Sequence, residues 1–190
     1  MKPRDPQKIE RIHEATLVLV SEIGLAGLTM SKIGKKAKLG MGTIYTYFES
    51  KEEIINSLYQ FLKKKHSREL FGSINIQQSF LEKFRILFQA FFKYRYYSQA
   101  ENFFIDQCKS SPALTPYSRE LEDNTFDKAR DLMEEGKAQG IVKDMDNDLL
   151  LSYVMGGIVA YVDHLKNQKV TLTQSLIDTA FDLCIDAIKA

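Results

Sequence analysis

The chain has 190 residues, of which 44% are hydrophobic and 27% are charged, and its formal net charge is +1 at neutral pH. This composition is ordinary for a globular protein of one or two compact domains. No apolar run approaches the roughly 18 residues that cross a bilayer, and the N-terminus lacks the apolar core of a signal peptide. We therefore expect a cytoplasmic protein without a membrane partner.

The charge is unevenly distributed along the chain. Residues 1–51 hold nine Lys or Arg and five Asp or Glu, whereas the remainder holds seventeen basic and twenty acidic residues. A basic N-terminal part on a weakly acidic remainder favours a nucleic-acid contact near the N-terminus. The two cysteines, Cys108 and Cys184, lie far apart and form no Cys-x-x-Cys pair, so the sequence supports neither a disulfide framework nor a zinc site.

The first predicted helix begins at Pro6, because proline is tolerated in the first turn of a helix. Ile9, Ile12 and Ile23 share its apolar face with Thr16, and Gly24 ends it.

Two short helices joined by a tight turn follow, over residues 29–48. Thr29 caps the first of them, which places Ile33 and Ala37 on one apolar face. Residues 38–40 form the turn, and Ile44 with Phe48 faces inward from the second helix. Hydroxyl and aromatic side chains on an exposed short helix, with lysines nearby, suit a phosphate backbone and base edges. The side chains expected on the wet faces of the second helix are Met41, Thr43, Tyr45, Thr46 and Tyr47.

The string GTIYTYF at residues 42–48, followed by SKEE at residues 50–53, resembles the TetR family of bacterial transcriptional repressors. The resemblance covers roughly residues 9–55. Two positions depart from the family pattern: Lys38 stands in the turn where glycine is usual, and Gly40 caps the second helix where serine is frequent. Lysine can adopt the left-handed conformation at modest cost and glycine is an acceptable N-cap, so we expect the fold to be kept.

The resemblance implies which residues meet DNA. Base edges would be contacted by Ser31, Met41, Thr43 and Thr46, and phosphates by Thr29, Tyr45, Tyr47 and Lys51. Lys32 and Gly42 complete the expected DNA-binding set.

Ser50 and Glu53 form a predicted capping box that starts a long helix over residues 51–71. Further helix starts are predicted by the same kind of signal in the rest of the chain. Asn75 with Gln78 is predicted to open a helix that runs to about Arg95, and Ser98 with Glu101 to open one that runs to about Cys108. Thr115-Pro116 is predicted to begin a helix that stops at Gly140. Asp146 caps the next predicted helix, and Thr171 with Gln174 caps the last. The prediction is an all-α protein of about nine helices, with a helix-turn-helix domain at residues 1–50 and an effector-binding and dimerisation domain at residues 51–190.

Residues 84–104 hold nine of the 21 aromatic residues of the chain. Phe84, Phe88, Phe91 and Phe92 share one helical face, so the cluster is either core or the lining of a cavity. By resemblance to the family, the working hypothesis is an apolar effector pocket. Its candidate lining residues are Phe88, Phe92, Tyr96, Phe103, Phe126 and Met133, with Asp106 or Arg130 as polar selectors.

The apolar faces of the last two predicted helices are wide enough to need a partner as well as a core. In the resembling family these helices pair with those of a second subunit as a four-helix bundle, and two symmetric heads then read a palindrome. The expected dimer residues are Tyr153, Gly157, Tyr161, Leu176, Phe181 and Cys184.

The sequence offers little to catalysis. His13, His66 and His164 form no metal-binding spacing, and the chain lacks a Gly-rich phosphate loop, so we expect no enzyme, no metal and no cofactor. The prediction is a homodimeric repressor that binds a palindromic DNA operator and releases it when a small, largely apolar effector fills the C-terminal domain. A regulator that activates or answers to a protein partner, and an all-helical enzyme or ligand carrier, are the alternatives.

Overall fold

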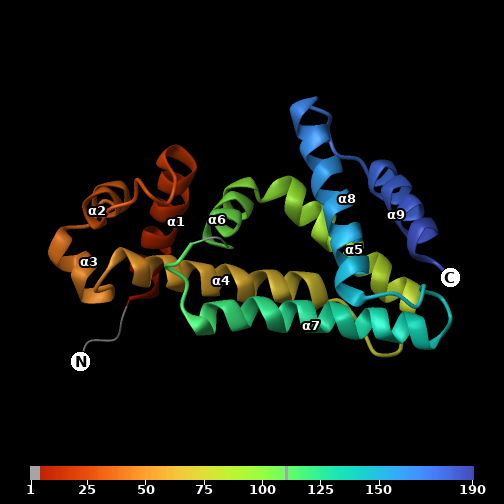
Figure 1. The fold of residues 1–190 in the computed structure, drawn as a ribbon. Coiled ribbons are helices and arrows are strands. Elements are labelled where there is room, and N and C mark those ends of the chain that lie inside the picture. The colour runs from red at the N-terminus through yellow and green to blue at the C-terminus, as the bar shows by residue number, and fades with distance from the viewer. Residues whose placement is uncertain (1–4, 110) are drawn as a thin grey trace. The chain divides into compact units, whose positions relative to one another are not determined.

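The structure, a computed structural model, describes residues 5–109 and 111–190. Within those residues the chain forms nine helices, and its one β-type pairing is an isolated antiparallel bridge between Val142 and Lys189 (Figure 1). The all-α prediction is confirmed. In chain order the helices are α1 Pro6–Ile23, α2 Met30–Ala37, α3 Met41–Tyr47, α4 Lys51–Phe71, α5 Phe80–Tyr97, α6 Gln99–Lys109, α7 Pro116–Ala138, α8 Asn147–Asn167 and α9 Gln174–Ile188.

Most of the predicted helix ends are confirmed. The α1 helix begins at Pro6 and ends before Gly24, whose φ of 68° is a conformation that glycine adopts without strain. The α8 helix begins after Asp146, whose carboxylate accepts a hydrogen bond from the backbone N–H of Leu149 at 2.8 Å.

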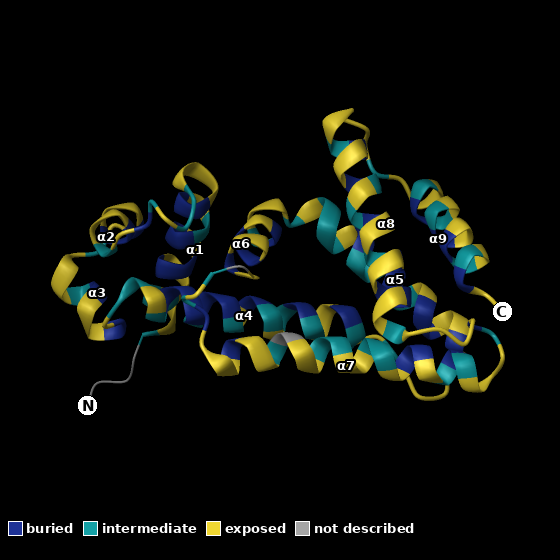
Figure 2. Cartoon of the chain, viewed as in Figure 1, coloured by how far each residue is buried: buried dark blue, intermediate teal, exposed yellow. Residues whose placement is uncertain are grey.

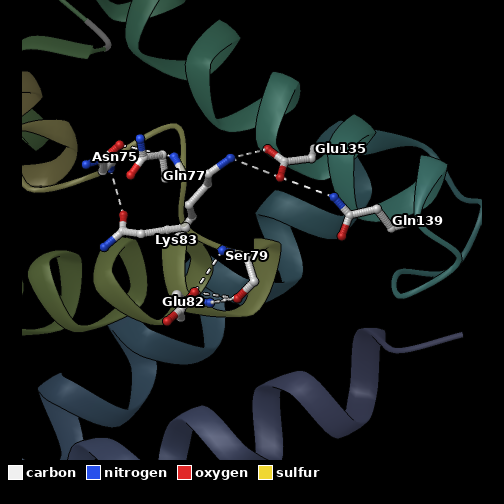
Figure 3. A network of polar contacts seen from close by, with 8 residues as sticks. Asn75, Gln77, Ser79, Glu82, Lys83, Glu135 and Gln139 are labelled. Atoms are coloured by element: carbon white, nitrogen blue, oxygen red, sulfur yellow. Dashed lines mark hydrogen bonds and ion pairs between the residues drawn. The ribbon is translucent and has the colours of Figure 1, made fainter.

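Two predicted starts were wrong. The α5 helix is capped by Ser79, which forms a reciprocal capping box with Glu82 (Figure 3), whereas Asn75 and Gln78 close a separate turn just before it. Both capping pairs form, but the helix continues only from the second. The last helix is capped by Thr173 and not by Thr171, because the Thr173 hydroxyl accepts from the N–H of Leu176.

The contacts divide the chain into two compact units that do not follow chain order. The first takes the chain through Lys64 together with Gln99–Leu121, and the second takes Lys65–Ser98 together with Glu122–Ala190. Both α4 and α7 therefore contribute residues to each unit. The boundary predicted at residue 50 is a different division of the chain, and as a functional boundary it stays a prediction.

The first unit packs α1 against α2 and α6, as Figure 1 shows, and α2 against α3. Its core joins α1, α2 and α3, which together are called the head, to α4 and α6. The buried members include Ile12, Leu28, Ile33, Ile44, Phe48, Leu58, Tyr59, Phe104, Cys108 and Leu114.

The second unit packs α5 against α8 and α9, and α8 against α9. Phe84, Phe88 and Phe92 are buried with Phe181 and Met133, so much of the aromatic cluster is core. A half-buried ion pair also links α5 to α7: the Lys83 ammonium donates to both carboxylate oxygens of Glu135, at 3.0 and 2.9 Å (Figure 3).

The α8 helix is long and apolar enough, by length and composition alone, to cross a membrane. It differs in this from the expectation that no segment would do so. Its buried side chains, Leu150, Leu151, Val154, Ile158, Val162 and Leu165, belong to the core of the second unit. Only 33% of the most apolar 18-residue stretch of α8 is buried within the chain. Figure 2 shows exposed residues recurring along the helix.

Candidate nucleic-acid interface and the groove on the second unit

The α2 and α3 helices form the predicted helix-turn-helix. The Thr29 hydroxyl accepts from the N–H of Lys32 at 3.3 Å, which confirms the cap of α2. Lys38 ends α2 with a φ of 54°, so lysine does occupy the left-handed position of the turn. The Arg11 guanidinium donates to the carbonyl oxygens of Ala37, at 2.6 Å, and Lys38, at 3.1 Å. This cation satisfies carbonyl groups that the helix end leaves open.

Close packing of α2 on α3 depends on Gly34. A Cβ at this position would lie 3.2 Å from the Leu39 carbonyl oxygen and 3.4 Å from the side chains of Met41 and Ile44. The buried Ile44 then anchors α3. The packing leaves one side of α3 open to solvent.

That open side of α3 carries most of the side chains predicted to read DNA. Tyr45 is 54% exposed, Met41 and Thr46 are exposed, and Thr43 is half-buried. The Thr46 hydroxyl donates to the Gly42 carbonyl oxygen at 2.8 Å, and its lone pairs remain available as acceptors. No heavy atom lies within 4 Å of a Cβ built on Gly42, so the backbone of α3 can approach a ligand closely here.

Tyr47 corrects the prediction that all the aromatic and hydroxyl side chains of α3 are exposed. It is only 7% exposed and belongs to the core of the first unit. Its hydroxyl accepts a hydrogen bond from the backbone N–H of Asp5 at 3.2 Å, which ties the start of α1 to α3. The buried ring of Tyr47 therefore helps to position α3, and a contact of its hydroxyl group with DNA stays a prediction.

Three lysines of the first unit have fixed partners, two of them backbone carbonyl groups and one a carboxylate. The Lys32 ammonium donates to the Gly27 carbonyl oxygen at 2.8 Å, and the Lys51 ammonium donates to that of Leu28 at 3.4 Å. Lys36 pairs with Glu22 at 2.8 Å. Each ammonium has further donors, so these lysines can still bind phosphate.

His13 on α1 joins the head to α4. Its side chain is buried, its Nε2 lies 3.0 Å from the Ser57 hydroxyl, and its ring packs against Phe48 and Phe61. Burial disfavours the charged imidazolium, and it lowers the pKa of His13 from 6.5 to about 4. The head is therefore joined to α4 through a neutral imidazole at neutral pH.

Acidification should weaken the packing of His13 against α4 and lower the free energy of unfolding. In the unfolded chain His13 takes up a proton below pH 6.5, whereas the folded chain resists protonation until about pH 4. The stabilisation is thus complete above pH 6.5 and is lost as the pH falls toward 4. Urea unfolding at pH 7.5 and pH 4.5 should show the wild type losing about 2.5 kcal/mol more than His13→Gln, which cannot titrate. Equal losses in the two proteins would contradict the role of His13.

A groove of about 770 Å³ opens on the second unit, lined by residues of α5, α8 and α9. Phe88 and Phe92 of α5 line it together with Gly156 and Gly157 of α8. No heavy atom lies within 4 Å of a Cβ built on either glycine. Two large side chains of the lining are exposed, Tyr153 at 62% and Leu183 at 73%. The groove is an apolar surface that this chain leaves open.

The groove brings together residues that were predicted for two different roles. Phe88 and Phe92 come from the predicted effector pocket, and Tyr153, Gly157, Tyr161 and Cys184 from the predicted dimer interface. The two other dimer candidates, Leu176 and Phe181, pack in or against the core of the second unit.

The remaining pocket candidates are divided between the two units. Phe103 and Asp106 are exposed on α6 in the first unit. In the second unit Met133 is buried, Phe126 is half-buried, and the Tyr96 hydroxyl donates to the Val170 carbonyl oxygen at 2.9 Å. Arg130 pairs with Asp148 at 2.7 Å and Asp127 at 2.8 Å, and these hydrogen bonds raise its pKa.

Among the described residues no group of three or more His, Cys, Asp or Glu side chains could hold a metal ion. Cys108 and Cys184 are free and buried, and burial raises the pKa of each thiol to about 12. Both thiols are therefore protonated and unreactive at neutral pH.

Both parts of the chain match family models. Residues 12–58 match the model of bacterial regulatory proteins of the tetR family, and residues 52–190 match that of the tetracyclin repressor-like C-terminal domain. Among curated proteins, the uncharacterized HTH-type transcriptional regulator YhgD of Bacillus subtilis is 22% identical over 176 residues, which cover 92% of each chain.

Solved structures share the fold over nearly the whole chain. A TetR family transcription regulator from Marinobacter aquaeolei matches with a TM-score of 0.88 and 22% identity, over 100% of this chain and 99% of that one. The fatty acid degradation regulator FadR from Bacillus halodurans matches with a TM-score of 0.73 and 23% identity, over 97% of each chain.

Proposed function

The chain belongs to the TetR family of DNA-binding transcriptional regulators, and from this premise we propose that it is a homodimeric repressor released from DNA by a small apolar effector. The repressor acts in the cytoplasm on a palindromic operator. The residues predicted from the sequence define the head that reads the operator, and the second unit supplies the partner surface and the effector site.

The exposed side of α3 is the observation that carries the proposal. Met41, Tyr45 and Thr46 project from a short helix whose other side is held by Ile44 and Tyr47. Such a helix enters the major groove with its side chains toward the base edges. Lys32 and Lys51, whose ammonium groups donate to backbone carbonyl oxygens, supply the phosphate contacts that set its register.

The open groove supports the dimer. Glycine costs about 1 kcal/mol relative to alanine inside a helix, yet α8 carries Gly156 and Gly157 side by side where nothing in the chain crowds them. The exposed side chains of Tyr153 and Leu183 line the same groove as these glycines. A second copy related by a two-fold axis would place its own Tyr153 and Leu183 against this groove. Its docking covers apolar surface that water otherwise contacts.

The effector site belongs to the second unit in this proposal. Phe88, Phe92 and Met133 give that unit an aromatic and apolar interior, which favours an apolar ligand. The half-buried Arg130 is the candidate for recognising a polar end of the ligand. Phe103 and Asp106 lie in the first unit and are the weaker candidates.

Selection of duplexes from a random library by the full chain tests the function. The wild type should enrich a palindrome, and its affinity should fall steeply with salt because phosphate contacts release counterions. Gly157→Arg should sediment as a monomer and enrich only half-sites. Asn167→Arg adds the same charge at the end of α8, outside the groove lining, and should behave as the wild type does. A wild type that enriches no duplex sequence would sink the proposal.

The alternative of an activator differs only in the sign of the response. A reporter gene behind the enriched palindrome should rise when the chain is deleted if it represses, and fall if it activates. An all-helical carrier or enzyme with a purely structural N-terminal domain would show no salt-dependent binding to duplex DNA.

A further inference from the structure

A buried polar cluster in the first unit centres on Asn56 of α4, whose side chain is 6% exposed. Its amide nitrogen donates to the carbonyl oxygens of Glu52, at 2.8 Å, and Ala113, at 2.7 Å. Its amide oxygen accepts from the Thr115 N–H at 2.9 Å and from the Ser118 hydroxyl at 2.7 Å. A side-chain amide has two donors and two lone pairs, so all of its hydrogen-bonding capacity is used.

The partners of Asn56 are themselves satisfied. Ser118 is completely buried, and besides donating to Asn56 its hydroxyl accepts from the Gln60 amide at 3.1 Å and lies 3.0 Å from the Thr115 hydroxyl. Because the single Ser118 proton goes to Asn56, the Thr115 hydroxyl donates to Ser118. Thr115 in turn accepts from the Ser118 N–H and so caps α7. A closed network of this kind tolerates few alternative arrangements.

An apolar anchor fixes the same segment. Leu114 is buried in the core of the first unit with Phe104 and Cys108 of α6 and with Leu58 of α4. The apolar packing of Leu114 is not directional and does not fix a position along α4. The hydrogen bonds of Asn56 are directional, and they specify where the first turn of α7 lies along α4. The start of α7 is thus locked to the helix that directly follows the reading helix.

Three segments lead from the first unit to the second: α4 after Lys64, the step from Ser98 to Gln99, and α7 after Leu121. The lock ties two of these three, α4 and α7, to each other inside the first unit. Resting on the proposed function, we propose that Asn56 is a positioning residue that holds the reading head at a fixed place relative to α7, and so sets the half-site spacing that the dimer accepts.

Hydrogen exchange of the full chain without DNA tests the lock itself. Asn56→Asp keeps the shape of the side chain but replaces its donor by a carboxylate oxygen, which repels the carbonyl oxygens of Glu52 and Ala113. The start of α7 should therefore separate from α4, and exchange of the Thr115 and Ser118 N–H groups should rise about tenfold. Gln60→Glu makes the same chemical change one turn further along α4 and removes only one bond, so its effect there should stay within about twofold. Ser118→Ala is a milder break that serves if Asn56→Asp does not fold. Unchanged exchange at both amides in Ser118→Ala and Asn56→Asp overturns the lock.

Operator spacing tests its consequence. Palindromes with one base pair added or removed at the centre should bind the wild type about tenfold more weakly than the best spacing, because half-site separation is geometric. In Asn56→Asp this ratio should fall to about threefold or less, with the half-site sequence preference unchanged. A lower affinity at every spacing with an unchanged ratio reflects only a weaker fold and overturns the positioning role alone. A wild type that enriches no palindrome overturns the proposed function and this role together.

Discussion

Replacing Thr43 and Tyr45 together by alanine should weaken operator binding about 100-fold or more, because each lost base or phosphate contact costs roughly 1–3 kcal/mol. Tyr45 is exposed and Thr43 half-buried, so the substitution removes recognition groups and leaves the core of the head intact. Fluorescence anisotropy with the enriched palindrome measures the loss, and circular dichroism should show an unchanged melting curve.

Tyr97→Ala is the matched control, because Tyr97 is also an exposed tyrosine but belongs to the second unit. It should bind the operator as the wild type does. Tyr47→Ala is unsuitable as a probe of DNA contact, since its buried ring supports the head, and Tyr47→Phe removes the hydroxyl alone. Binding by Thr43→Ala with Tyr45→Ala within threefold of the wild type would mean that α3 does not read the operator.

Replacing Gly136 by alanine should lower the free energy of unfolding by on the order of 3 kcal/mol through overpacking. A Cβ at this position would lie 2.6 Å from the Phe80 ring and 2.6 Å from Val142. Neither neighbour can move easily: Phe80 is fully buried and stacked on Phe84, and the backbone of Val142 is bridged to Lys189. The roughly 1 kcal/mol that alanine gains in a helix cannot offset this clash. Urea unfolding measures the difference.

Gly42→Ala is the control for that measurement, because nothing lies within 4 Å of its added methyl group and stability should not fall. Phe80→Leu in the Gly136→Ala background makes room beside the new methyl group. The double variant should therefore be more stable than the sum of the single losses predicts. Simple addition of the two losses would show that Phe80 is not the obstacle.

Much of the head could be predicted from the sequence because its signals are local. Thr29 caps α2 through a residue three positions away, and Ile33, Ala37 and Ile44 are buried as their spacing predicts. The string at residues 42–48, which carries the family resemblance, is likewise local, because it lies within α3 and its C-cap. Where two local signals compete, local reading fails: the pair Asn75–Gln78 and the pair Ser79–Glu82 both form, and only the second starts a helix.

Burial on α3 was harder to predict. The spacing placed Tyr47 among the wet residues, but the ring is buried and its hydroxyl meets the backbone of Asp5, 42 positions away. Periodicity ranks the faces of one helix but does not say how wide a face its neighbours cover. The same limit applies to the final helices, where Tyr153 stays exposed while Phe181 is buried.

Most of the helices, the recognition motif and the family could be predicted without the structure, because caps, turns and apolar spacing act between residues three or four positions apart. The packing of α6 and the start of α7 with the helix-turn-helix, and the grouping of predicted pocket and dimer residues in one groove, depend on contacts between distant parts of the chain and could not. The tertiary structure also made Asn56 significant, since the hydrogen bonds that lock α7 join residues 57 to 62 positions apart. A lone asparagine within a helix carries no local signal of such partners.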